Sequence, residues 1–138
     1  MAERVPPHMC FACSPNNPIG LKLQFEDVGD TLRTSFTPRE EHQGWPGWTH
    51  GGLVTTVLDE AMAQWVWRRE ITAMTADLSI RFRHGLPLGE TLRVEARRVS
   101  ARGCLLELEA EGKLDDGTVI AQAKAKFMIV TRETVARG

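Results

Sequence analysis

The second half of the chain alternates apolar and polar residues with a period of two, which is typical of half-buried strands. In the stretch 90–100, Leu92, Val94 and Ala96 share one face, and the positions between them carry charged side chains. The same alternation predicts further strands over 73–84, 104–114 and 118–130. A hairpin signal at Asp115-Asp116-Gly117 joins the last two of them.

Two shorter strands are predicted near the start of the chain, over 21–27 and 31–37, with a turn around Gly29. The loop that follows, over 38–49, is rich in glycine, proline and tryptophan. Large apolar side chains are costly to leave in water. We therefore expect this loop, including Trp48, to fold over a neighbouring subunit or a ligand.

A mostly apolar run from Leu53 to Trp67 predicts a helix over about 51–68. At about 100° per residue, one stripe of this helix collects apolar side chains. The stripe consists of Leu53, Val54, Val57, Leu58, Ala61 and Trp65. Asp59 points nearly opposite it, on a face that also carries Met62 and Val66 and is otherwise small or apolar. We expect that second face to be a subunit interface containing one acid, and we expect the neighbouring Glu60 to pair with an arginine.

The predicted order is two strands, one helix and four strands, which indicates an α+β fold. We expect a curved antiparallel sheet of five to six strands wrapped around one long central helix. Three alanines on the inward face of the last strand, Ala121, Ala123 and Ala125, leave room for that helix to lie close. Residues 21–138 are predicted to form this single domain, and residues 1–20, rich in proline and turn formers, an N-terminal arm.

The composition limits which partners and which cellular compartment are expected. The net charge is −1, so nothing in the bulk charge indicates a nucleic acid or an anionic membrane as a partner. No apolar run is long enough to predict a membrane span, and the first residues lack the apolar core of a signal peptide. Three cysteines, an odd number, do not make a disulfide framework and favour a reducing, cytoplasmic location.

Cys10 and Cys13 form a single C-x-x-C motif in the predicted arm, with His8 two residues before it. A structural zinc site uses about four ligands. The sequence has no second motif of this kind, although His42 could be a distant ligand. Two reduced thiols packed under an N-terminal flap are the favoured interpretation, and metal or redox use stays open.

The pattern His50-Gly51-Gly52 followed by Leu58-Asp59-Glu60-Ala61 resembles the hotdog-fold acyl-CoA thioesterases, and within them the PaaI-like (phenylacetate-degradation-type) subgroup. The resemblance extends over about residues 10 to 130, because the leader Cys10-Phe11-Ala12-Cys13 is also similar to one found in some relatives. It implies hydrolysis of a small to medium or aromatic acyl-CoA. It also implies a homodimer, or a dimer of dimers, without a cofactor or a metal at the active site.

The resemblance also implies roles for particular residues. Gly51 would present its backbone N–H to the thioester carbonyl beside His50, and Asp59 would be the catalytic carboxylate. Many relatives have an asparagine a few residues before the histidine; here that place is Gly44, and Gln43 beside it is the candidate amide. A serine or threonine that some relatives contribute from the second subunit would fall near His84.

The chemistry is consistent with the residues themselves. Free N–H groups at a helix N-terminus stabilise developing negative charge, and Gly51 and Gly52 let a substrate approach without a Cβ in the way. Asp59 can act as a nucleophile or activate a water. However, eight residues of helix separate Gly51 from Asp59 by about 12 Å, so one thioester cannot touch both. Two helices packed antiparallel across a two-fold axis would bring Gly51 of one chain near Asp59 of the other.

The phosphates of coenzyme A call for basic residues at the mouth of the pocket. Arg81, Arg83 and His84 are candidates near one strand end, and three further arginines lie near another, namely Arg97, Arg98 and Arg102. Trp48 and the other tryptophans suggest an apolar or aromatic acyl pocket, although core packing would explain them equally well. Two other functions remain open: a non-catalytic module that binds acyl groups or coenzyme A, and a hotdog dehydratase or hydratase.

Overall fold

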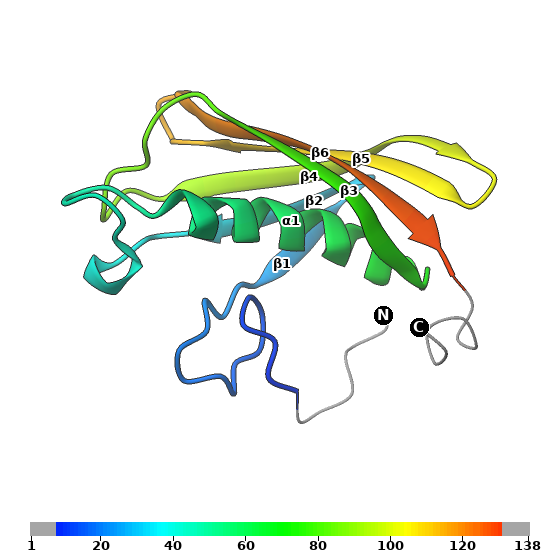
Figure 1. The fold of residues 1–138 in the computed structure, drawn as a ribbon, viewed down its shortest axis with the longest axis horizontal. Coiled ribbons are helices and arrows are strands. Elements are labelled where there is room, and N and C mark those ends of the chain that lie inside the picture. Colours follow the sequence, from blue (N-terminus) through cyan, green and yellow to red (C-terminus); the bar gives the residue numbers. More distant parts are fainter. Residues whose placement is uncertain (1–7, 131–138) are drawn as a thin grey trace.

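The computed structural model describes residues 8–130, which form one curved antiparallel sheet around a single long helix (Figure 1). The strand order in the sheet is β1-β2-β4-β5-β6-β3. The elements are β1 (Phe25–Val28), β2 (Thr31–Phe36), the short 3₁₀ helix η1 (Glu40–His42), α1 (Gly51–Trp67), β3 (Ala73–Phe82), β4 (Leu92–Arg102), β5 (Leu105–Lys113) and β6 (Val119–Ile129). The predicted α+β class, the element order and the helix are thereby confirmed.

The first strand is shorter than predicted. Leu21 and Leu23 do not join the sheet; their backbone N–H groups instead donate to Phe11 O at 2.8 Å and to Ala12 O at 3.0 Å. Lys22 between them has a φ of 53°, a left-handed conformation that interrupts an extended strand. The alternating apolar residues of this segment therefore hold the N-terminal arm rather than extend β1.

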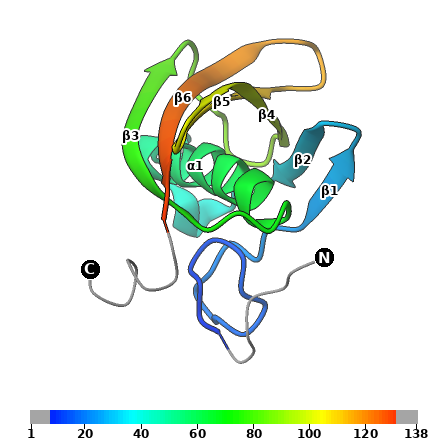
Figure 2. The same cartoon turned by 90° about the vertical axis from the view of Figure 1, so that its right-hand side faces the viewer.

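The arm consists of turns over its described residues and lies across α1 on the side away from the sheet (Figure 2). Ala12 and Ser14 are buried there, so the helix is covered on two sides within one chain. Met62 and Val66 of α1 are buried as well. The open face around Asp59 is therefore narrower than predicted, and consists mainly of Gly52, Thr55, Thr56 and Ala63.

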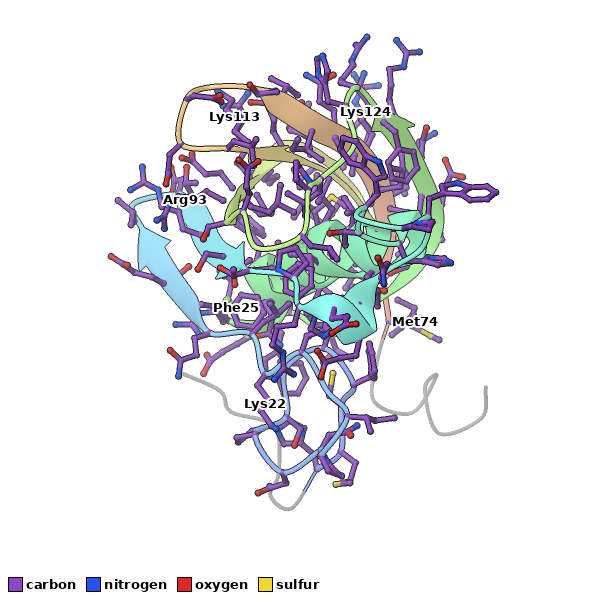
Figure 3. All side chains as sticks on the ribbon, turned by 90° about the vertical axis from the view of Figure 1, so that its left-hand side faces the viewer. Lys22, Phe25, Met74, Arg93, Lys113 and Lys124 are labelled. Carbon is purple, nitrogen blue, oxygen red and sulfur yellow. The ribbon has the colours of Figure 1, made fainter. Side chains whose placement is uncertain are left out.

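The core lies between α1 and the concave face of the sheet. Ala121, Ala123 and Ala125 on β6 are each at most 3% exposed, which agrees with the prediction that small residues admit the helix. The other side of the sheet is charged, and Figure 3 shows Lys113 and Lys124 there, projecting away from the helix. Within residues 8–130, no helix is both long and apolar enough to cross a membrane.

A larger side chain at Ala123 should destabilise the protein. Ala123 is 2% exposed beneath the helix, and inserting extra methylene groups into a packed core costs about 1–3 kcal/mol. We expect Ala123→Leu to lower the free energy of unfolding by this amount in a urea titration. Lys124→Leu, next to it on the outer face, is the matched control and should change stability by less than about 0.5 kcal/mol. Equal effects of the two substitutions would contradict the assignment of these faces.

Candidate active site

The mouth of α1 is shaped by His50, which caps the helix. Its backbone is extended (φ −60°, ψ 129°), and its Nδ1 accepts a hydrogen bond from the Gly52 N–H at 2.9 Å. A neutral imidazole that accepts at Nδ1 carries its proton on Nε2. The structure therefore gives His50 a capping contact, and it withdraws the Gly52 N–H from the groups that could bind a substrate.

Gly51 is the first residue of α1, so its N–H has no acceptor within the helix. The ring of Phe82, at the end of β3, lies beside it, because a Cβ built on Gly51 would meet two ring carbons at 3.5 Å. Phe82 is 53% exposed although it is large and apolar. A helix N-terminal N–H beside an exposed aromatic ring is a suitable place for a carbonyl group attached to an apolar acyl chain.

Asp59 is half-buried in the middle of α1. Its Oδ1 is buried and has no hydrogen-bond partner among the described residues. Burial raises the pKa of this carboxyl above its ordinary value, and the neighbouring charge of Glu60 raises it further. A poorly solvated carboxylate with a raised pKa is a stronger base than an ordinary surface aspartate.

Within one chain, the Gly51 N–H and the Asp59 carboxylate do not lie close together. Because α1 is continuous from Gly51 to Trp67, Asp59 lies about 12 Å further along its axis than Gly51. The residues at the N-terminal end of α1 are His50, Gly51, Gly52 and Phe82. Asp59 lies away from them on the open face of the helix.

The loop before the helix is held against the segment that follows β3. Trp48 packs on Gly85, where an added Cβ would lie 2.7 Å from the indole ring, and the Thr49 N–H donates to Leu86 O at 2.9 Å. Gln43 Oε1 accepts from the Gly47 N–H at 2.6 Å, so its oxygen is used inside the loop, and its role as a catalytic amide stays a prediction. Trp48 keeps 47% of its surface exposed beside the helix mouth.

Arg81 and Arg83 lie on the outer face of the sheet, on the opposite side of β3 from Phe82. They line an open polar groove of about 870 Å³, and Arg83 Nε donates to Gln122 Oε1 at 3.1 Å. The ring of His84 contacts Val119 O at 3.0 Å through Nδ1. The structure thus places the two arginines on the face of the sheet away from Gly51 within one chain, and the role of all three residues in phosphate binding stays a prediction.

The sequence prediction left out one residue of the site, Phe82. Phe82 was not among the candidates, although an apolar residue between Arg81 and Arg83 indicates a side chain that faces the other side of the strand. Glu60 Oε1 accepts from Gln64 Nε2 at 3.1 Å and lies 4.0 Å from Cys10 Sγ, and the expected pairing of Glu60 with an arginine stays a prediction. The arm therefore reaches the helix at Glu60, the residue after Asp59.

A curved antiparallel sheet around one central helix, with glycines at the helix mouth, defines a protein of the hotdog fold. The sequence model of the thioesterase superfamily matches residues 46–121, more than half of the chain, so the chain belongs to the thioesterase superfamily. A search of curated proteins found no match.

Solved structures share this fold. One is a thioesterase superfamily protein, similar at 26% sequence identity with a TM-score of 0.80; the match covers 85% of this chain, which spans 61% of the length of that protein. The PaaI protein of the E. coli phenylacetic acid degradation operon is similar at 16% identity, with a TM-score of 0.73 over 78% of this chain and 83% of its own. A hypothetical thioesterase from Streptococcus pneumoniae, solved with coenzyme A, has 16% identity and a TM-score of 0.73, over 78% and 85% of the two chains.

Proposed function

We propose that this protein hydrolyses acyl-CoA thioesters to the free acid and coenzyme A, in active sites shared between two subunits. The observation that carries the proposal is the pair of groups on α1. Gly51 offers a backbone N–H at the helix N-terminus, and Asp59 offers a half-buried carboxylate whose Oδ1 has no partner among residues 8–130. Family membership supports the reaction class.

The Gly51 N–H would bind the thioester carbonyl oxygen. When water or a carboxylate attacks the carbonyl carbon, the oxygen becomes negatively charged, and both the N–H and the positive end of the helix dipole stabilise that charge. Because His50 occupies the Gly52 N–H, the proposal assigns this role to Gly51. Collapse of the tetrahedral intermediate breaks the C–S bond and releases the coenzyme A thiolate.

Asp59 of the partner subunit would supply the second group. As a base it takes a proton from the attacking water; as a nucleophile it forms a mixed anhydride that water then cleaves. In both cases the carboxylate must be ionised, and its raised pKa makes it the better base. Two α1 helices packed antiparallel across a two-fold axis would span the separation of about 12 Å and would give the same site in both chains of the dimer.

The aromatic residues beside Gly51 favour a small to medium or aromatic acyl group. Phe82 is 53% exposed and Trp48 is 47% exposed, so both can cover an apolar group on a thioester held at Gly51. Arg81, Arg83 and His84 are the proposed contacts for the phosphates of coenzyme A.

The test is release of free thiol from aliphatic and aryl acyl-CoA substrates, followed with a thiol reagent. We expect at least one substrate to be hydrolysed at a rate that increases in proportion to protein concentration. Binding of acyl-CoA without thiol release from any substrate would overturn the enzyme assignment and favour the binding module.

Hybrid dimers should show whether the site is shared. We expect a dimer of one Asp59→Asn chain and one Gly51→Pro chain, purified with two different affinity tags, to keep about half of the wild-type activity, because one of its two sites is intact. Both homodimers should be inactive, since each damages both of its sites. A hybrid as inactive as the homodimers would show that each site lies within one chain.

A further inference from the structure

Three side chains outside the proposed active site meet between the N-terminal arm and α1. They are Cys10 and Cys13 of the arm and Glu60 of the helix. Their sulfur and carboxylate oxygen atoms all lie within 4.8 Å of one another, and Cys10 Sγ is 4.0 Å from Glu60 Oε1. The proposed hydrolysis uses none of the three.

The arm holds the two cysteines in a fixed turn. The Ser14 N–H donates to Cys10 O at 3.0 Å, which closes the turn that places both thiols on one side. The two residues between the cysteines are tied down through their carbonyl groups: Leu21 N–H donates to Phe11 O and Leu23 N–H to Ala12 O. The ligand geometry is thus supported by the backbone rather than left to exposed side chains.

Glu60 approaches the thiols from a rigid position. It is 8% exposed in the middle of α1, and Gln64, one turn later, donates from Nε2 to Glu60 Oε1 at 3.1 Å. The same Nε2 lies 3.8 Å from Cys13 Sγ. A donor that contacts two neighbouring ligands is the kind of support that orients the first coordination shell of a metal site.

We propose that Cys10, Cys13 and Glu60 bind a divalent cation of the zinc type, which fastens the N-terminal arm to α1. Two thiolates select a borderline or soft ion such as Zn²⁺, and a carboxylate oxygen is an ordinary third ligand. With bonds of about 2.3 Å to sulfur and about 2.0–2.2 Å to oxygen, tetrahedral ligands lie about 3.5–3.8 Å apart. Small side-chain rotations bring the three atoms from their present positions to that spacing, and solvent takes the fourth position.

This site does not rest on the proposed function. Binding of the cation connects two segments that are about 50 residues apart in the sequence, so its first effect is on the arm. We expect an increase in the melting temperature and slower hydrogen exchange over residues 10–24. Both effects can be measured without any thioester substrate.

The test uses the full-length protein, reduced with a phosphine, stripped with a chelator and titrated with Zn²⁺ or Co²⁺. We expect one ion per chain by elemental analysis, a higher melting temperature, and near-ultraviolet charge-transfer absorption from thiolate to Co²⁺. Cys10→Ser and Cys13→Ser should each abolish stoichiometric binding. Glu60→Gln keeps the size of the side chain and an oxygen for Gln64, so it should fold and weaken binding by at least about tenfold.

Cys104→Ser is the matched control, because Cys104 is exposed in the turn between β4 and β5 and contacts Met128. It should bind the ion like the wild type. Absence of stoichiometric metal from the reduced wild-type protein would overturn the proposal, as would unchanged binding by a folded Cys10→Ser variant. A Cys10–Cys13 disulfide that forms in air, without metal binding after reduction, would also overturn it and point to redox use.

Discussion

Replacing Asp59 with asparagine should lower kcat for thioester hydrolysis by about 10²- to 10⁴-fold, the share that a positioned acid–base group contributes. Asparagine has nearly the same shape but can neither accept a proton nor attack a carbonyl. Because the Gly51 N–H is untouched, KM should change much less than kcat. Steady-state thiol release at saturating acyl-CoA measures the effect.

The same substitution should not cost stability at neutral pH. Burial, and then the charge of Glu60, raise the pKa of Asp59 in the folded protein. A group whose pKa is higher in the folded state binds its proton more tightly there, so it lowers stability increasingly as the pH rises above its ordinary pKa. Asp59→Asn removes this loss of stability, so the variant should have a higher melting temperature than the wild type at pH 7. The difference in melting temperature should become smaller as the pH is lowered. Loss of activity would then not reflect unfolding.

Asp30→Asn in the exposed turn between β1 and β2 is the control and should be fully active. Glu60→Gln tests the neighbouring acid, which lies one residue further along α1. If Asp59→Asn were active and Glu60→Gln inactive, the catalytic carboxylate would be assigned to the wrong residue.

Much of the fold could be predicted because its signals are local. The period-two alternation in the second half of the chain gives the four long strands, and the apolar run behind two glycines gives α1 within one residue at its C-terminal end. The predicted start of the first strand was wrong, because nothing in the sequence marks Lys22 as a residue with a left-handed backbone. This segment pairs with the N-terminal arm, which is a tertiary contact. Alternation of apolar and polar residues cannot distinguish pairing with the arm from pairing within the sheet.

The candidate site also has a part that local spacing predicts and a part that depends on tertiary structure. Gly51 and Asp59 are linked by one helix, so their separation of about 12 Å follows from spacing alone. Two other contacts, those of Phe82 with Gly51 and of Cys10 with Glu60, are between residues that are distant in the chain. Their meeting depends on how β3 and the arm cross the helix, which a single sequence does not encode as a pattern. The arginines beside Phe82 are predicted to lie at the mouth of the pocket; the pleat of β3 turns them to the outer groove, and their role in phosphate binding stays a prediction.

Replacing Gly51 with proline should lower kcat by about 10²- to 10³-fold, the cost of removing one oxyanion-hole donor. Proline has no N–H, so the substitution deletes the single group that we assign to the thioester oxygen. The first position of a helix tolerates proline well, and the extended backbone of His50 suits a following proline. Circular dichroism and thermal melting should therefore resemble those of the wild type.

Gly51→Ala separates the lost N–H from the added bulk. Alanine keeps the donor, and its Cβ would meet the Phe82 ring at 3.5 Å, an ordinary contact distance. We expect this variant to keep most of its kcat and to raise KM for the bulkiest acyl groups, since the Cβ occupies space at the helix mouth. If alanine reduced kcat as much as proline, space at Gly51 would be the requirement rather than its N–H, and the oxyanion would have to be stabilised elsewhere. A large loss with proline alone would place the developing charge at the N-terminus of α1, where the helix dipole adds to the hydrogen bond.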